Sequence, residues 1–208
     1  MAEPASRNAT YEDLYTIPED ATGEIICGEL IVTPRPSRQH AYAASALNAR
    51  LGSPYQFGEG GGPGGWGILM EPEIGLGEHI LVPDLAGWKV GRFPFEEDRN
   101  WISTVPDWVC EILSPRTAGL DKSRKMPVYA QFGVAHAWLL DPIANRTLDV
   151  YRLEPGGWWR LLESYGESND RVRAEPFQEV EIRLPDLWME SRKPPGSHAQ
   201  QPGHRRAQ

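Results

Sequence analysis

Cysteine is scarce in this chain of 208 residues, which has only Cys27 and Cys110. Two cysteines are too few for a disulfide framework, and neither has partners at zinc-site spacing. Both lie in apolar, strand-like runs, so we expect buried free thiols.

Long apolar runs are also missing. No apolar run approaches the ~18 residues that span a bilayer, and the start of the chain lacks a signal-peptide pattern. We therefore expect a cytoplasmic protein with no membrane partner.

Positive charge is also in short supply. The formal net charge is −8, and residues 191–208 carry four basic and no acidic side chains, so the rest of the chain carries −12. Such a chain is not coated with basic surface for nonspecific DNA binding. A protein that acts on nucleic acid is not excluded, but any nucleic-acid groove must be local, and a bound cation must offset repulsion between acidic residues of the groove and phosphate.

The glycine-rich stretch at residues 52–67 lacks the Gly-Lys-Ser/Thr ending of a phosphate-binding loop, which excludes a nucleotide hydrolase of that type. Its eight glycines predict a flexible loop rather than a helix.

The C-terminal segment, residues 191–208, has few apolar residues. We therefore expect one domain over residues 1–190, followed by a disordered tail.

The segments that do have regular patterns alternate between strands and helices. Apolar and β-branched runs predict strands at residues 24–33 (a hairpin turning at Gly28-Glu29), 66–76, 80–90, 108–113, 137–140, 146–153, 158–164 and 177–182, and helical spacing predicts helices at residues 38–51 and 122–132. Gly133-Val134 ends the second helix, and Pro127 either occupies its first turn or kinks it. This order predicts an α/β (α+β) fold with a mixed central sheet flanked by helices.

Two acidic residues and a lysine stand in these apolar and helical segments. Asp84 follows Pro83 in one predicted strand, Glu111 lies within another, and Lys125 lies in the helix that follows. An unpaired charge at Glu111 would be costly to bury, so we expect it to share a cation with Asp84 or to meet Lys125. Carboxylates from neighbouring strand ends beside a lysine suit a hard divalent cation and hydrolysis of a phosphodiester.

Simpler explanations exist for the same residues. The tripeptide Val-Pro-Asp ends at both Asp84 and Asp107, and Leu-Pro-Asp ends at Asp186, so a Pro-Asp pair alone is also typical of an ordinary turn. Asp141, which precedes a proline, likewise fits a turn residue. In an extended strand Asp107 lies roughly 13 Å from Glu111, too far to share an ion. Lys122, Arg124 and Lys125 by themselves fit a solvated helix face.

Three longer sequence motifs follow one another along the chain: LVPDLAGWKV at residues 81–90, VPDWVCEILSPRT at 105–117 and DKSRKMPVYAQFGVAHAWLLDP at 121–142. Over residues 11–187 the chain resembles the Uma2 family (DUF820), a branch of the PD-(D/E)XK nucleases related to restriction endonucleases. The resemblance implies a restriction endonuclease-like core and a metal-dependent endonuclease. Its implied partner is nucleic acid, DNA in preference to RNA, and its implied cofactor is Mg²⁺, for which Mn²⁺ can substitute.

The resemblance also assigns residues. Asp84 and Glu111 match the metal ligands, and the Ile112 carbonyl is a further candidate ligand. In the parent motif the strand position two residues after the glutamate, on the same face, is lysine, but here it is Leu113. Family members that resemble this chain supply the lysine from the next helix, where Lys125 matches it.

Four further residues are weaker candidates. His40 occupies a position where the family often has histidine, Glu29 or Glu71 would add a metal ligand, and Lys122 would contact phosphate. A lone residue of these types is more often structural.

Two rival functions stay open. The first rival is a nuclease fold that has lost catalysis and serves as a binding or regulatory module. It is favoured by Leu113, which replaces the lysine of the parent motif, and by the net charge of −12 outside residues 191–208. The eight tryptophans allow a carbohydrate-binding sandwich around Trp158-Trp159, although their scatter predicts mostly core positions. A homodimer is compatible with the chain, but one sequence reveals no interface.

Overall fold

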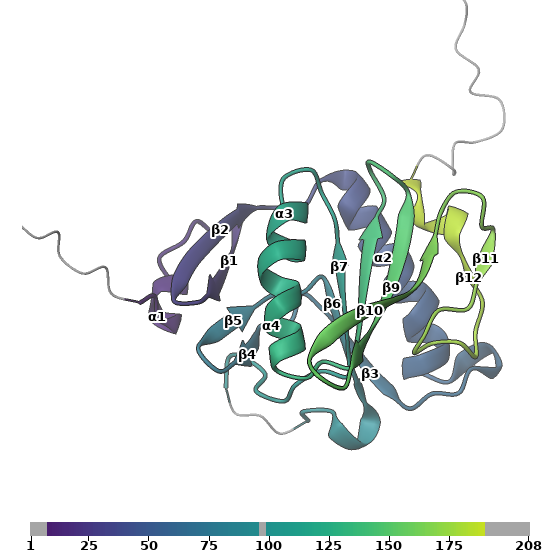
Figure 1. The fold of residues 1–208 in the computed structure, drawn as a ribbon, viewed down its shortest axis with the longest axis horizontal. Helices are drawn as coiled ribbons and strands as arrows, with labels where there is room; N and C mark the ends of the chain where they lie inside the picture. The colour runs from purple at the N-terminus through teal and green to yellow at the C-terminus, as the bar shows by residue number, and fades with distance from the viewer. Residues whose placement is uncertain (1–7, 96–98, 190–208) are drawn as a thin grey trace, which may run out of the picture.

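The structure is a computed structural model that describes residues 8–95 and 99–189. Its centre is a six-stranded mixed sheet with the order β10-β9-β8-β7-β6-β3 (Figure 1). The strands are β3 (Trp66–Met70), β6 (Leu85–Lys89), β7 (Trp108–Ile112), β8 (His136–Asp141), β9 (Thr147–Glu154) and β10 (Trp158–Tyr165). Only the β7–β8 pairing within this sheet is parallel. The predicted mixed central sheet is therefore confirmed.

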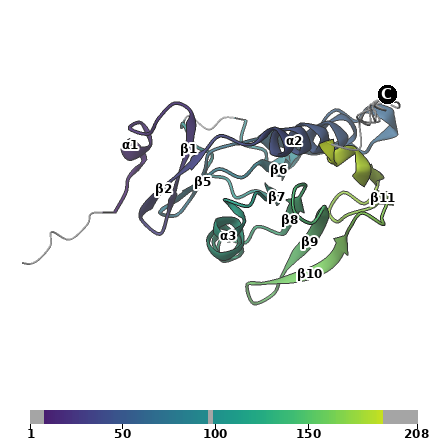
Figure 2. The same ribbon diagram turned by 90° about the horizontal axis from the view of Figure 1, so that it is seen from above.

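Helices cover both faces of this sheet. Helix α2 (Arg38–Leu51) lies on one side, and the segment from α3 (Ala118–Leu120) to α4 (Met126–Gln131) lies on the other (Figure 2). Strand alternation in β7 divides the core between them. Trp108, Cys110 and Ile112 join the hydrophobic cluster on the α2 side, whereas Val109 joins the cluster on the α4 side. The expected core is thus present on both faces, and Glu111 points to the α4 side.

A second, four-stranded sheet has the order β2-β1-β5-β4. It consists of β1 (Ala21–Ile26), β2 (Glu29–Pro34), β4 (Ile74–Leu76) and β5 (His79–Leu81), and the short helix α1 (Tyr11–Leu14) precedes it. The β1–β2 hairpin was predicted, but its two-residue turn is Cys27-Gly28, with φ values of 52° and 73°. Because it occupies the turn, Cys27 is exposed, which corrects the expectation of two buried thiols; Cys110 is buried.

Two predicted strands are each divided between the sheets. Residues 66–76 form β3 and β4, because the chain turns at Glu71, where φ is 47°. Residues 80–90 contain the end of β5 and all of β6, because the strand is interrupted at Val82, Pro83 and Asp84. This interruption leaves Asp84 between the sheets, immediately before β6.

The glycine-rich stretch was wrongly predicted to be wholly loop. Gly52–Gln56 continues α2 as a π-helical turn, and Glu59–Gly61 forms a 3₁₀ turn. Two side chains anchor the first turn: Tyr55 is 1% exposed in the core, and the Gln56 side-chain oxygen accepts a hydrogen bond of 2.9 Å from the Ile68 N–H. The burial of Tyr55 and the hydrogen bond of Gln56 together outweigh the low helix propensity of the surrounding glycines.

The second predicted helix begins four residues earlier than expected. Ala118–Leu120 forms α3, Asp121–Lys125 is a π-helical turn, and Met126–Gln131 forms α4. Pro127 lies in the first turn of α4, where its missing N–H is tolerated. Gly133, with φ of 79°, lies just beyond the helix end, as predicted.

The predicted strand at residues 177–182 is wrong. Only β12 (Ile182–Arg183) forms there, paired with β11 (Arg171–Val172), and Phe177 enters the core from a turn instead. A 3₁₀ turn at Leu184–Leu187 follows, and another occurs at Val90–Arg92. The predicted tail at residues 191–208 lies outside the described residues.

The arrangement of helices and sheet rules out the carbohydrate-binding sandwich, which required a nearly all-β chain. Trp88, Trp108 and Trp138 are fully buried, so these tryptophans are core residues as expected. None of the helices within the described residues is long and apolar enough to cross a membrane.

Candidate active site

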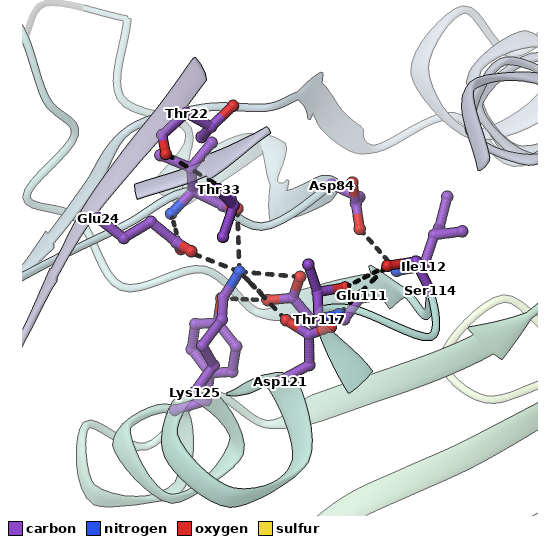
Figure 3. Close-up of polar contacts among 12 residues, drawn as sticks. Thr22, Glu24, Thr33, Asp84, Glu111, Ile112, Ser114, Thr117, Asp121 and Lys125 are labelled. Carbon is purple, nitrogen blue, oxygen red and sulfur yellow. Dashed lines mark hydrogen bonds and ion pairs between the residues drawn. The ribbon is translucent and has the colours of Figure 1, made fainter. Parts of the chain in front are cut away.

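A cavity of about 540 Å³ lies between the β1–β2 hairpin, the start of α2 and the segment after β7. It is lined by Thr22, Glu24, Thr33, Pro34, Arg35, Pro36, Ser37, Gln39, His40, Glu71, Val82, Asp84, Glu111, Ser114, Pro115, Arg116, Thr117, Leu120, Asp121, Lys125 and Ile143. The three principal predicted site residues are therefore brought to one cavity. Figure 3 shows the polar contacts at its floor.

Lys125 is at the centre of the polar cluster. Its Nζ lies 2.9 Å from Glu111 Oε1, 2.9 Å from Glu24 Oε1 and 3.9 Å from Asp121 Oδ1. It also donates a hydrogen bond of 3.0 Å to the Val82 carbonyl oxygen. Burial alone would lower the pKa of Lys125, but the surrounding carboxylates outweigh burial and raise it above its ordinary value. The ammonium is consequently held in its charged form.

Glu111 reaches Lys125 from the end of β7 and is 2% exposed. The Tyr129 hydroxyl, on α4, donates a hydrogen bond of 2.6 Å to Glu111 Oε1. Burial raises the pKa of the Glu111 carboxyl well above its usual range; Lys125 opposes this shift, and the neighbouring carboxylates reinforce it. Ionised Glu111 therefore gains from any additional cation in the cavity.

Asp84 lies beside the same strand. Its Oδ2 accepts a hydrogen bond of 2.6 Å from the Ile112 N–H, and its Oδ1 lies 3.2 Å from His40 Nε2. Burial alone would lower the pKa of His40, but the hydrogen bond and charge of Asp84 outweigh burial and raise it. Within the described part of the chain, His40 Nδ1 is buried without a hydrogen-bond partner. His40 is thus placed to fix the Asp84 carboxylate.

Acidic groups outnumber basic ones at this floor. Glu24, Asp84, Glu111 and Asp121 supply four carboxylates, and Lys125 is the only buried lysine or arginine among the described residues. In the same residues no three His, Cys, Asp or Glu side chains converge in a metal-binding group. Mg²⁺, however, commonly takes only one or two carboxylates and completes its shell with water and phosphate oxygens. The oxygen donors and the excess negative charge therefore fit a hard divalent cation.

The weaker candidates separate into two groups. His40 lies in the site, and Glu71 lines the cavity as an exposed residue whose N–H donates a hydrogen bond of 3.0 Å to the Asp84 carbonyl. Glu29 does not line the cavity; it pairs with Arg124 at 2.8 Å. Lys122 is exposed and also lies outside the cavity lining.

The other Pro-flanked aspartates have structural roles. Asp107 accepts a hydrogen bond of 2.9 Å from the Lys89 N–H and pairs with Arg92. Asp186 pairs with Arg50. Asp141 Oδ1 accepts hydrogen bonds from two backbone N–H groups in the turn after β8, as expected for a turn residue.

Three residues of the cluster were not predicted: Glu24, Asp121 and Tyr129. Each has a sequence signal in retrospect. Glu24 begins a strand segment whose next two residues are isoleucine, so its burial with a partner was inferable, as for Glu111. Asp121 and Tyr129 stand four residues before and after Lys125, which places all three side chains on one helix face.

Comparisons with known proteins identify the family and the fold of the chain. The model of the Uma2 family, described as "Putative restriction endonuclease", matches residues 9–185. A solved structure from Anabaena variabilis ATCC 29413, titled as that of "a putative nuclease belonging to DUF820", has a TM-score of 0.69 and 25% sequence identity, covering 86% of this chain and 97% of that one. No curated protein matches the chain. Both matches support the prediction of a nuclease, and the chain belongs to the Uma2 family.

Proposed function

We propose that this protein is a divalent-metal-dependent endonuclease that hydrolyses phosphodiester bonds of DNA, with Mg²⁺ as its cation and Mn²⁺ as an effective substitute. The observation that carries the proposal is the position of Lys125 Nζ, 2.9 Å from Glu111 Oε1, in the cavity that Asp84 also lines. A lysine beside two strand-end carboxylates supplies both the cation ligands and a fixed positive charge.

Asp84 and Glu111 would hold the cation, together with the Ile112 carbonyl. When bound there, a divalent cation would acidify a water molecule and neutralise negative charge on the scissile phosphate. His40 would keep Asp84 oriented through the 3.2 Å contact between its Nε2 and Asp84 Oδ1.

Lys125 would orient the attacking water and stabilise the charge that develops on the phosphate oxygens. Because its pKa is raised, the ammonium donates hydrogen bonds instead of accepting the proton of the water. In-line attack by the water oxygen on phosphorus would then form one P–O bond and break the P–O bond to the leaving sugar oxygen. The water would release one proton to solvent and the leaving oxygen would gain one, which gives a phosphomonoester end and a hydroxyl end.

The test is cleavage of supercoiled plasmid and of single-stranded DNA with Mg²⁺ or Mn²⁺. We expect wild-type protein to cleave, and Asp84→Asn and Lys125→Ala to lose about 100-fold or more in rate, which is typical of lost transition-state stabilisation. Asp107→Asn is the matched control, because Asp107 ends the second Val-Pro-Asp motif of the chain and does not line the cavity. Thermal unfolding of each variant separates lost chemistry from lost folding. Full activity of Asp84→Asn would refute the site.

A second candidate is a nuclease fold that binds nucleic acid without cutting it. Leu113 favours this alternative, because it is 4% exposed in the hydrophobic cluster on the α4 side, where the parent motif has a lysine. Calorimetric titration with Mn²⁺ distinguishes the two candidates. An active site must bind the cation, whereas an inactive module has no need to keep Asp84 and Glu111 as ligands.

A further inference from the structure

The depth of the candidate site restricts which nucleic acids can reach it. Glu111 and Lys125 are 2% and 3% exposed, so a scissile phosphate must enter the cavity to approach them. The cavity volume of about 540 Å³ equals that of a cube with an edge of about 8 Å. Cavities of roughly 300–1,000 Å³ accommodate one drug-sized ligand, which is the scale of one or two nucleotides.

A B-form duplex does not match these dimensions. Its two strands flank a major groove about 12 Å wide, and the duplex is stiff over ~150 base pairs. Neither strand of an intact duplex can therefore enter so small a cavity while it stays paired and stacked. Enzymes that act on a base inside the duplex meet a comparable obstacle, and they act on single strands or extrude the target nucleotide from the helix.

The β1–β2 hairpin forms one wall of the cavity, and polar contacts hold it to the rest of the protein. Glu24, on β1, contacts Lys125 and accepts a hydrogen bond of 2.7 Å from the Val82 N–H. Arg124 donates a hydrogen bond of 3.1 Å to the Ile26 carbonyl, and Ile26 is fully buried. Opening this wall for a duplex would break the cluster that holds Lys125 in place.

Two arginines at the mouth of the cavity are placed to hold a strand. Arg116, in the segment after β7, and Arg35, between β2 and α2, both line the cavity and are exposed. Within the described residues Arg116 makes no hydrogen bond or ion pair, which leaves its guanidinium available for phosphate. In a chain with a net charge of −8, such local contacts must supply the electrostatic attraction.

We propose that the substrate is a single strand, or an unpaired segment of a duplex, and that Arg116 binds a phosphate next to the scissile one. This inference rests on the proposed nuclease function and narrows its substrate class. Each nucleotide enters from the mouth, where Arg116 and Arg35 contact the backbone, and the scissile phosphate lies at the floor beside Glu111 and Lys125.

The first experiment compares three forms of one end-labelled DNA strand with Mn²⁺: the strand alone, the strand in a perfect duplex, and the strand in a duplex with a central unpaired bubble. We expect the single strand to be cut about tenfold faster than the duplex or more, and cuts in the third form to fall within the bubble. Equal cleavage of the perfect duplex would overturn this inference and leave the nuclease function intact. No cleavage of any form would overturn the nuclease function, and this inference with it.

The second experiment tests Arg116. Arg116→Ala should raise KM for the single strand about fivefold with little change in kcat, and should reduce the slope of log(kcat/KM) against log[salt] by about 0.7, the value for one phosphate contact on a single strand. Arg160→Ala is the control, because Arg160 is exposed on β10 outside the cavity lining. An unchanged salt slope in Arg116→Ala would remove Arg116 from the proposal.

Discussion

Lys125 Nζ and Glu111 Oε1 lie 2.9 Å apart although one residue is in a helical turn and the other in β7. The π-helical turn at Asp121–Lys125 directs the lysine stem back toward the strand end. Packing of α4 against the sheet, through Met126 and Tyr129, then fixes the turn. The helix thereby supplies a charge that the strand lacks at Leu113.

The Tyr129 hydroxyl gives the first prediction. Tyr129→Phe removes the 2.6 Å hydrogen bond to Glu111 Oε1 while it keeps the ring in the core. Because a buried acceptor loses a donor, the free energy of unfolding should fall by about 1–3 kcal/mol, measured by urea denaturation. Tyr151→Phe is the control, since the Tyr151 side chain is only half-buried; its effect should stay within about 0.5 kcal/mol. Equal effects of the two variants would contradict a specific role for Tyr129.

Asp121 gives a prediction about pH. Burial raises its pKa to about 6, from an ordinary value of 3.8, despite the opposing charge of Lys125. Between these two values Asp121 binds more protons in the folded state than in the unfolded state, so its contribution to stability decreases as pH rises from about 4 to about 6. The contribution of Asp121 to this loss is at most about 3 kcal/mol.

Urea denaturation of metal-free protein at several pH values measures this effect. Asp121→Asn should flatten the decline, although Glu111, whose pKa is also raised, keeps part of it. Asp20→Asn, at an exposed aspartate, should leave the decline unchanged. A decline of the same size in Asp121→Asn would show that another group causes it.

Sequence alone predicted those parts of the site that depend on local periodicity or on recognisable motifs. The two-residue strand period predicted that Glu111 shares a face with residue 113, and the resemblance to the Uma2 family, not the helical spacing, assigned Lys125 to the site. The role of Glu24 depends instead on a long-range pairing, because Ile25 of β1 pairs with Ile80 of β5 and carries Glu24 over the site. No local pattern encodes that pairing. Cys27 was misplaced for a different reason: a two-residue turn with positive φ took precedence over its apolar neighbours.

Binding of a cation should stabilise the protein against heat. At a free Mn²⁺ concentration of about 100 times Kd, the expected stabilisation is about 2.7 kcal/mol. Asp84→Asn should abolish the shift in Tm, because it removes a ligand, whereas Asp107→Asn should preserve it. Absence of any shift in wild-type protein would favour the inactive binding module over the nuclease.

The last prediction concerns variants in which the site lysine is moved from residue 125, on the helix, to residue 113, after β7. Leu113 and Glu111 share a strand face and stand about 7 Å apart, so a lysine stem at residue 113 can approach the Glu111 carboxylate. Leu113→Lys alone should destabilise the fold by about 3 kcal/mol, because it inserts an ammonium into the hydrophobic cluster while Lys125 already occupies the carboxylates. Lys125→Met alone should lose cleavage.

The double variant Leu113→Lys/Lys125→Met should cleave faster than Lys125→Met, because it returns one ammonium to the carboxylates and removes the competing one. Plasmid cleavage, corrected for the folded fraction from circular dichroism, measures the difference. A double variant no more active than Lys125→Met would show that approach from the helix is itself required. The reason would then be geometric: in this structure Lys125 contacts Glu24 and Glu111 together, and a lysine at residue 113 would have to reach both carboxylates from the strand.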